Sequence, residues 1–340
     1  MDASTGLPPV NEIRLRAWRQ SFGGDFYGAL QVAADYCGLQ KVPPRFPGNW
    51  QHGVWPPWQQ IQPEIIVYDA PKSTTCFVAR QDEVTFLKPA GYRRVRAIGL
   101  PIIYTQPSGL QRIPKSLLVM PTHSLASDVL MPSTEQYVLE IASIKDRFGL
   151  VAACVSPYCI AKGLWSSQFT EKGIEAIRGA GIADTNALNR MRALFERFEY
   201  VTTDGYGSHV FYALYFGAKV SIWGTPTQVF RENYLSDNGC AAYPEAIDIL
   251  LSEETKRKGE VYLGPLRVDP WIGVQNVDLG KLMLGQDNKL SPEEMRAAFG
   301  WTPLRNLVGF AGESVRRSPL WRAAGAAKRS LLATARIRAR

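Results

Sequence analysis

One segment of the chain combines residue types that bind phosphate. The stretch YVTTDGYGSHVFYALYFGAKVSIWG, Tyr200 to Gly224, reads as a strand, a glycine-rich turn, a short helix and a second strand. The turn carries five polar or glycine residues: Asp204, Gly205, Gly207, Ser208 and His209. The first turn of a helix has unpaired N–H groups and the positive end of the dipole, and glycines let a phosphate approach the backbone. The segment therefore predicts an anion-binding turn, or else a plain strand-to-helix turn capped by Ser208.

The chain has only three histidines, and each falls in a polar or glycine-containing turn. His52 lies in NWQHGVW, His123 in VMPTHS, and His209 in the stretch described above. Histidine is the side chain best able to move a proton, or to share one with a phosphate, near neutral pH. One such histidine could be incidental to the packing of its loop. Because all three histidines fall at such turns, we favour a functional site.

Alternating strands and helices must position these turns. Expected strands are Pro63 to Asp69, Val95 to Thr105 with a break at Pro101, Ser116 to Ser124, and GLVAACVS at residues 149–156. Expected helices are Gln81 to Leu87, Ser133 to Arg147, FTEKGIEAIRGAG at residues 169–181, Thr185 to Phe198, Ala246 to Leu251, and Ser291 to Phe299 with a capping box. This order predicts an α/β protein with parallel, doubly wound sheets, in which ligands lie beyond the carboxyl ends of strands. We place the domain boundary in the polar, Pro-rich stretch at residues 106–115.

Composition limits the class of protein. The 340 residues are 46% hydrophobic and 21% charged, enough for a large core and for two domains. We find no apolar segment long enough to span a membrane and no signal-peptide core at the start, so we expect a cytoplasmic protein. The five scattered cysteines indicate reduced thiols. Cys154 and Cys159 lack the further ligands of a zinc site.

The net charge of +8 is concentrated at the C-terminus. Residues 311–340 contain eight basic residues and one acidic residue, Glu313, so the rest of the chain is nearly neutral. The rest of the chain therefore lacks the basic excess expected of a nucleic-acid-binding protein. Arg322, Arg329 and Arg336 recur every seven residues, with Leu and Ala on the opposite side. Such a basic amphipathic helix suits an anionic membrane surface. A solvated terminus fits the pattern equally, and RNA binding is a third option.

These motifs resemble a known family of transferases. NWQHGVW is similar to the Trp-His-Gly loop of CDP-glycerol glycerophosphotransferases, the teichoic-acid polymerases, although Gln51 separates the Trp from the His. VMPTHS resembles their Pro-His segment, and VTTDGYGSHVFYALYFGAKVSI their donor-phosphate stretch, with Gly207-Ser208 in place of Ser-Ser. The same order more loosely resembles bacterial capsular-polysaccharide glycosyltransferases. The resemblance implies a GT-B-like fold, in which two Rossmann-like domains face each other across a cleft.

The resemblance also implies domains and roles. Residues 1–113 would form the acceptor-side domain, residues 114–310 the nucleotide-donor domain, and residues 311–340 a basic helical tail. His52 would be the general base, a catalytic role. His123, Ser208 and His209 would bind or neutralise the departing phosphate. Gly205 and Gly207 would admit the phosphate, and Asp204 would orient the loop or meet a donor hydroxyl. Ser156, Pro157 and Tyr158 could flank the base, and Arg112 and Lys115 could meet phosphate or be solvated linker charges.

We therefore expect a glycosyltransferase. It would move a sugar from a nucleotide-activated donor to a hydroxyl of a capsular or lipopolysaccharide-type glycan, on the inner face of the plasma membrane. No D-x-D element is present, so we expect activity without a metal or other cofactor, with hydrogen-bond donors and dipoles offsetting the leaving-group charge. The alternatives are a polyol-phosphate transferase of the CDP-glycerol type, a GT-B-shaped sugar-nucleotide 2-epimerase, and a non-catalytic membrane-associated subunit of polysaccharide assembly.

Overall fold

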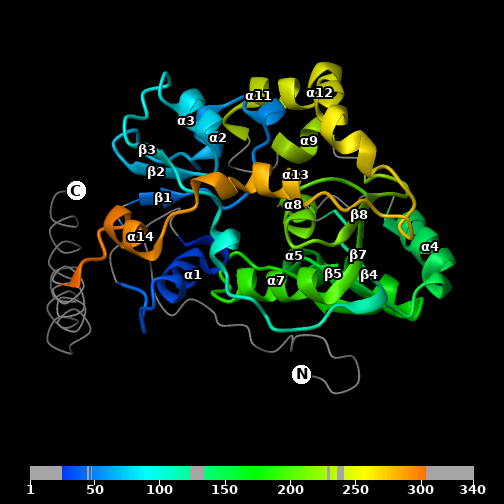
Figure 1. Ribbon diagram of the computed structural model, residues 1–340. Helices are drawn as coiled ribbons and strands as arrows, with labels where there is room; N and C mark the ends of the chain where they lie inside the picture. Colours follow the sequence, from blue (N-terminus) through cyan, green and yellow to red (C-terminus); the bar gives the residue numbers. More distant parts are fainter. Residues whose placement is uncertain are drawn as a thin grey trace, which may run out of the picture.

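The computed structural model describes residues 25–43, 46, 48–122, 134–227, 230–235 and 241–303. Within these residues the protein is α/β, with two separate parallel sheets of three and five strands. Figure 1 shows the two sheets side by side, each with its own helices. The alternation of strands and helices correctly predicted this class.

The smaller sheet belongs to the first third of the chain. Its parallel strands lie in the order β1-β2-β3: β1 (Gly48–Trp50), β2 (Thr75–Val78) and β3 (Val95–Ala97). The helices near it are α1 (Ala29–Tyr36), α2 (Pro63–Ile66) and α3 (Gln81–Leu87), with the 3₁₀ helices η1 (Phe26–Gly28), η2 (Pro57–Gln59) and η3 (Pro101–Tyr104). Residues 105–112 then lead into the larger sheet.

The larger sheet has the strand order β6-β5-β4-β7-β8, all parallel. Its strands are β4 (Ile113–Val119), β5 (Leu150–Val155), β6 (Glu175–Arg178), β7 (Phe198–Thr203) and β8 (Lys219–Ile222). The chain moves outward from β4 to β6 and then returns to the other side of β4 at β7. The order of the strands thus reverses between β4 and β7, and the carboxyl ends of strands at such a switch point form the crevice where doubly wound sheets bind ligands.

Helices cover both faces of the larger sheet. The elements between its strands are α4 (Thr134–Ile144), η4 (Lys145–Arg147), α5 (Pro157–Ala161), α6 (Ser166–Glu171), α7 (Ala187–Arg197) and α8 (Ser208–Tyr215). Leu117 and Val119 of β4 pack with α4, α5 and α6 on one face, whereas Leu118 packs with α7 and α8 on the other. This alternation along one strand is what a sheet buried on both sides requires.

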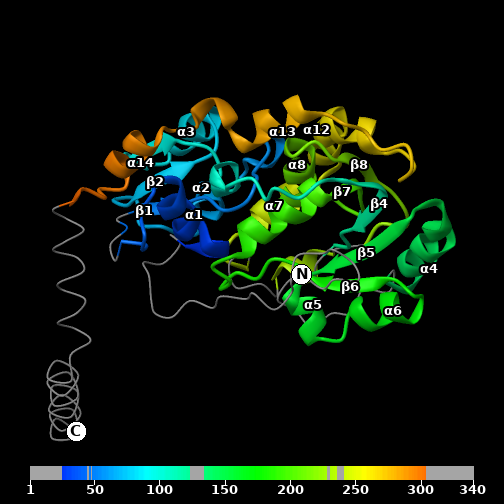
Figure 2. The ribbon, with the colours of Figure 1, turned by 60° about the horizontal axis from the view of Figure 1, so that its bottom comes forward.

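The last described segment returns to the smaller sheet. It contains α9 (Arg231–Leu235), α11 (Pro244–Leu250), α12 (Glu253–Leu263), η5 (Gly264–Leu266), α13 (Val277–Leu284), η6 (Gln286–Asn288) and α14 (Pro292–Ala298). Helix α13 packs along α8, and Phe299 then packs against Phe46 and Phe77 of the smaller sheet (Figure 2). One buried cluster therefore runs from Trp50 and Phe77 through the returning segment to Leu118 and Val201 of the larger sheet.

Several predicted elements are confirmed. The helix at Gln81 to Leu87, the strand within residues 149–156, and the strand, helix and strand of residues 200–224 all occur. The Ser291 capping box is also present, with the Glu294 N–H donating to Ser291 Oγ at 3.2 Å.

Three predicted elements are wrong in whole or in part. The strand predicted from Val95 to Thr105 ends at Ala97, and Pro101–Tyr104 is the 3₁₀ helix η3. Pro63 to Asp69 is not a strand: Pro63–Ile66 is α2, because Pro63 occupies the first helical turn, where its missing N–H is harmless, and Glu64 follows it there. Residues 169–181 are not one helix. Gly173, with φ of 71°, ends α6, and β6 begins at Glu175. The N–H groups of Gly173 and Ile174 donate to Thr170 O and Phe169 O, which closes α6 in the usual glycine-terminated way.

Candidate functional site

The switch point of the larger sheet is organised by Asp204, which follows β7 and is 2% exposed. Its Oδ1 accepts the Thr122 N–H at 2.7 Å, and Thr122 belongs to the segment after β4. Its Oδ2 accepts the Thr227 N–H at 3.1 Å and also the Thr227 hydroxyl, from the segment after β8. Asp204 therefore holds three loops together at one edge of the sheet. Of the two roles predicted for Asp204, these contacts correspond to orienting the loop.

The glycines of the turn allow close packing of these loops. A Cβ on Gly205 would lie 2.7 Å from Thr122 Oγ1, closer than real Cβ atoms come. Gly207 has an extended backbone, with φ of −168°, so its conformation does not itself demand glycine. A Cβ there would lie 3.1 Å from Nδ1 of His209.

The N-terminus of α8 is the part of the turn that could receive an anion. Within the described chain, the N–H groups of Gly207 and Ser208 donate to no acceptor. They lie at the start of α8, where the helix dipole is positive, as do the N–H groups of known anion-binding turns. Nε2 of His209 lies 3.1 Å from Thr203 Oγ1, so this ring is tied back to the end of β7.

His52 follows β1 and lies among aromatic rings. Its ring stacks on Tyr68 at a centroid distance of 4.1 Å and contacts Phe26 at 4.4 Å and Tyr27 at 5.4 Å. Its Nδ1 is buried and has no hydrogen-bond partner in the described structure. Burial among these rings lowers the pKa of His52 to about 3, although the residue as a whole keeps partial exposure. The imidazole is therefore neutral at physiological pH.

The structure brings the His52 loop and the α8 turn together. The Val54 N–H donates to Ser208 Oγ at 2.9 Å, and the Tyr212 hydroxyl of α8 donates to the His52 carbonyl at 2.9 Å. Gln59 also donates to the hydroxyl of Tyr206, the residue between the two glycines. Two motifs about 150 residues apart in sequence thus form one junction, where the carboxyl ends of the two sheets meet.

A polar network that sequence reasoning missed holds the His52 loop in place. Gln51 Nε2 donates to the Gly53 carbonyl at 2.8 Å and to Glu83 Oε1 at 2.9 Å, while its Oε1 accepts the Ala79 N–H at 3.0 Å. Gln51, which lies between Trp50 and His52, is thus a positioning residue. Its partners lie on other elements, so no local pattern could have revealed the contacts.

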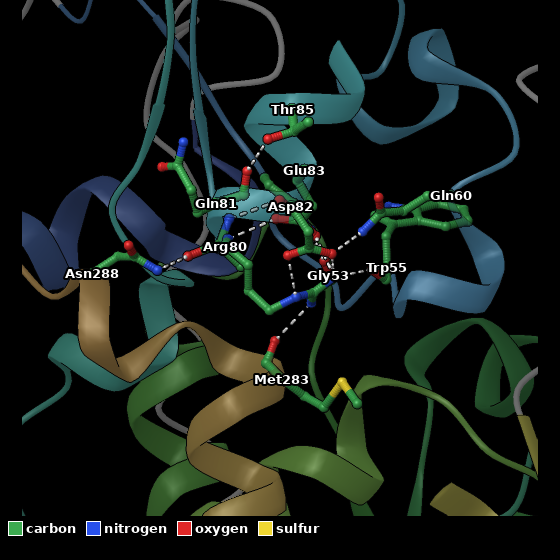
Figure 3. A network of polar contacts seen from close by, with 12 residues as sticks. Gly53, Trp55, Gln60, Arg80, Gln81, Asp82, Glu83, Thr85, Met283 and Asn288 are labelled. Carbon is green, nitrogen blue, oxygen red and sulfur yellow. Dashed lines mark hydrogen bonds and ion pairs between the residues drawn. The ribbon is translucent and has the colours of Figure 1, made fainter. Parts of the chain in front are cut away.

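Arg80 extends this network to the returning segment (Figure 3). Its guanidinium donates to the Trp55 carbonyl at 2.7 Å and to the Met283 carbonyl of α13 at 3.2 Å. Glu83 lies 3.4 Å from the same guanidinium and accepts the Arg80 N–H at 2.8 Å. Burial raises the pKa of Glu83, and the charge of Arg80 opposes that rise. Arg80 thereby ties the His52 loop, α3 and α13 to one another.

The remaining predicted residues lie outside the described part, at a helix cap, or at the amino end of β4. His123 falls in residues 123–133, which are outside it, as does the predicted tail at residues 311–340. Ser156 caps α5, accepting the Tyr158 N–H at 3.3 Å. Arg112 lies at the opposite, amino end of β4, where its guanidinium donates to the carbonyls of Phe198, Phe216 and Gly217. Arg112 is therefore a structural residue, and Lys115 lies at the same distant edge.

Two cavities of the described surface also lie elsewhere. One, of about 520 Å³, is at the amino ends of β4, β7 and β8 and is lined by Arg112, Glu199 and Lys219 among others. The second, of about 330 Å³, lies between α1 and the segment after η3. Neither is lined by His52 or by the 204–209 turn, which the His52 loop covers in this structure.

The described residues contain no cluster of three or more His, Cys, Asp or Glu side chains that could hold a metal ion. None of their helices combines the length and the apolar character required to cross a bilayer.

Comparison with known proteins does not place the chain in a family: no family model matches it, and no curated protein sequence does so either.

Proposed function

We propose that this protein is a glycosyltransferase that transfers a sugar from a nucleotide-activated donor to a hydroxyl group of a surface glycan. The observation that carries the proposal is the junction between the His52 loop and the N-terminus of α8. At this junction the loop of the neutral His52 meets the start of α8, where the Gly207 and Ser208 N–H groups have no acceptor among the described residues. The junction lies at the switch point of a parallel sheet. Two parallel sheets joined at their carboxyl ends also support, as part of this proposal, a GT-B-like arrangement.

In the proposed reaction the α8 turn binds the donor phosphates. The acceptor oxygen forms a bond to the anomeric carbon as the bond from that carbon to the phosphate oxygen breaks. The hydroxyl proton moves to His52, and the leaving nucleotide keeps the electron pair. Gly207, Ser208 and the α8 dipole stabilise the negative charge that develops on the phosphate. A bound phosphate would raise the low pKa of His52, because a nearby anion favours the protonated ring.

One observation favours a second candidate, a non-catalytic nucleotide-binding subunit. A pKa of about 3 makes His52 a poor proton acceptor in the free protein, because general bases work best with a pKa near the working pH. Both candidates use the phosphate turn, so both predict nucleotide binding. Only the glycosyltransferase predicts turnover, and a measurement of turnover therefore distinguishes them.

Nucleotide binding tests the shared part of the proposal. Thermal unfolding would be followed with CMP, CDP, UDP, GDP and dTDP. A nucleotide at about 100 times its Kd should stabilise the wild type by about 2.7 kcal/mol. Ser208→Ala should reduce this effect, whereas Ser291→Ala, which removes the serine cap of distant α14, should lower the midpoint without changing the nucleotide effect. Absence of any nucleotide effect on the wild type would rule out both candidates.

Turnover then decides between them. With a donor identified, His52→Ala should reduce kcat about 100-fold or more and leave donor affinity within a few fold, as expected for loss of a general base. The matched control is Tyr68→Phe, which keeps the ring that stacks on His52. We expect turnover to persist in EDTA. Donor binding without turnover, across a broad acceptor panel, would favour the non-catalytic subunit.

A further inference from the structure

An exposed basic edge lies at the end of the smaller sheet that faces away from the His52 junction. We define the basic edge as Lys88, Arg93, Arg94 and Arg96, all of which are exposed. They lie on or next to β3, which among the described strands pairs with β2 alone and is an edge strand of this sheet. We propose that the basic edge is a docking surface for an anionic lipid bilayer. The proposal is independent of the proposed function.

The charge of the basic edge is not compensated. From Val84 to Ser127 the chain contains no Asp or Glu, although it contains six basic residues. In the described structure no ion pair involves Arg93, Arg94 or Arg96, and Lys72 pairs with Glu64 at 3.9 Å. The basic edge therefore presents its full charge to an approaching surface.

Helix α12 offers an informative contrast within the same molecule. Its consecutive Lys256, Arg257 and Lys258 are also exposed. However, Lys256 pairs with Glu253 and Lys258 with Glu254, each at 2.7 Å. Two basic stretches of similar size thus differ in one respect, because acidic neighbours offset the charge on α12 but not on the basic edge.

Geometry connects the basic edge with the basic C-terminal sequence. The register aligns Gly48 of β1 with Thr75 of β2, and Cys76 with Val95 of β3, so Arg94 lies at the same end of the sheet as Gly48. Two strand spacings separate β1 from β3, about 10 Å. The segment after α14, which leads to residues 311–340, packs on this sheet through Phe299. The basic C-terminal sequence therefore continues from a segment that packs on the same sheet as the basic edge.

This arrangement suits a bilayer more than simple protection of a strand edge. Charged side chains on an edge strand do prevent edge-to-edge pairing. That role would not require a second basic stretch, and stable membrane attachment usually needs two weak signals acting together. In addition, the amino end of β3 points away from the carboxyl ends of the strands, so docking would leave the His52 junction uncovered.

The test is binding of the full chain to vesicles. Binding would be measured by co-sedimentation with two kinds of vesicle. One kind contains phosphatidylcholine alone, and the other contains phosphatidylcholine and phosphatidylglycerol in equal parts. Each Lys or Arg close to an anionic bilayer strengthens binding about fivefold, so the triple variant Arg93→Gln, Arg94→Gln, Arg96→Gln should bind about 100-fold more weakly. The matched control is Lys256→Gln, Arg257→Gln, Lys258→Gln, which lowers the net charge by the same amount and should bind nearly as the wild type does.

Further variants keep the test decisive. Replacing the same three arginines by Lys keeps the charge and should restore binding, and equal urea midpoints would show that all variants are folded. Equal weakening by the two Gln variants would mean that only total charge matters, which would overturn the proposal. So would vesicle binding that does not change in the basic-edge variant. Loss of binding to a single-stranded oligonucleotide, with vesicle binding unchanged, would identify the surface as a nucleic-acid site instead.

Discussion

His52 is positioned by aromatic rings and by its backbone more than by hydrogen bonds of its ring. Tyr68 and Phe26 enclose the imidazole, while Tyr212 holds the His52 carbonyl. A ring surrounded in this way resists protonation, because the charged form would lose its hydration without gaining a partner. The packing that holds the His52 ring therefore also determines its protonation state.

The stability of the fold should depend on pH through His52. Its pKa is about 3 in the folded state and near 6.5 when the chain is unfolded. Between these values the unfolded chain binds one more proton, so the free energy of unfolding rises with pH, by at most about 1.4 kcal/mol per pH unit. Stability from this group is thus complete above pH 6.5 and is lost as the pH falls toward 3. Urea unfolding of the wild type at several pH values between 4 and 7 would measure this rise.

Other groups change stability in the same direction, so the comparison must be made against a variant. His52→Gln removes the titrating ring, and its free energy of unfolding should rise less steeply over the same range. Parallel pH dependence in the two proteins would show that the ring is protonated as easily in the fold as in the unfolded chain.

Residue types predicted part of the junction and could not predict the rest. The sequence placed Gly205, Gly207 and Ser208 correctly between a strand and a helix, because strand, turn and helix signals are local. It left the role of Asp204 open, since the partners of this carboxylate, Thr122 and Thr227, follow two other strands. Contacts between distant segments are set by the sheet order, which single-residue patterns do not encode.

At the scale of elements, the packing of α13 on α8 depends on one glycine. Gly280 of α13 faces the backbone of α8, and a Cβ there would lie 2.7 Å from the Tyr215 Cα. Since the obstacle is backbone, α13 would have to move. Gly280→Ala should destabilise the protein by about 1–3 kcal/mol despite the better helix propensity of alanine. The thermal midpoint should fall by several degrees.

Gly149→Ala is the control for this prediction. Gly149 is exposed, and the nearest atom to its added Cβ would be the Lys115 carbonyl oxygen at 4.0 Å. We expect little change in its thermal midpoint. An unchanged or raised midpoint in Gly280→Ala would mean that α13 can shift away from α8 without loss of stability.

The predictability of the elements followed the strength of their local signals. Gln81–Leu87 was predicted as a short helix that ends before Pro89, and the structure adds two acidic residues in its first turn. Pro63–Ile66 was taken for a strand because a short apolar run fits a buried strand and a buried helix equally. Strands β1 and β2 were not predicted, since strands of three and four residues are too short to display a period.

At the scale of the whole molecule, the two sheets share one core. The buried cluster that contains Trp50 and Phe77 also contains Leu118 and Val201 of the larger sheet and Phe211 of α8. The returning segment closes this cluster, because Phe299 contacts Phe46, Trp50 and Phe77. Two sheets joined in this way should not unfold independently, even though each also has a cluster of its own on its far side.

We therefore predict a single cooperative unfolding transition, with equal calorimetric and van't Hoff enthalpies. Phe299→Ala should destabilise the whole protein by about 3–5 kcal/mol and move this transition to lower temperature without splitting it. Leu282→Ala, at a residue of the same segment that is 55% exposed, should change stability by less than about 0.5 kcal/mol. Scanning calorimetry of the three proteins provides the comparison. Two separate transitions in the wild type, with only one of them moved by Phe299→Ala, would mean that the shared cluster does not couple the sheets, and the His52 junction would then be a contact between independently folding domains.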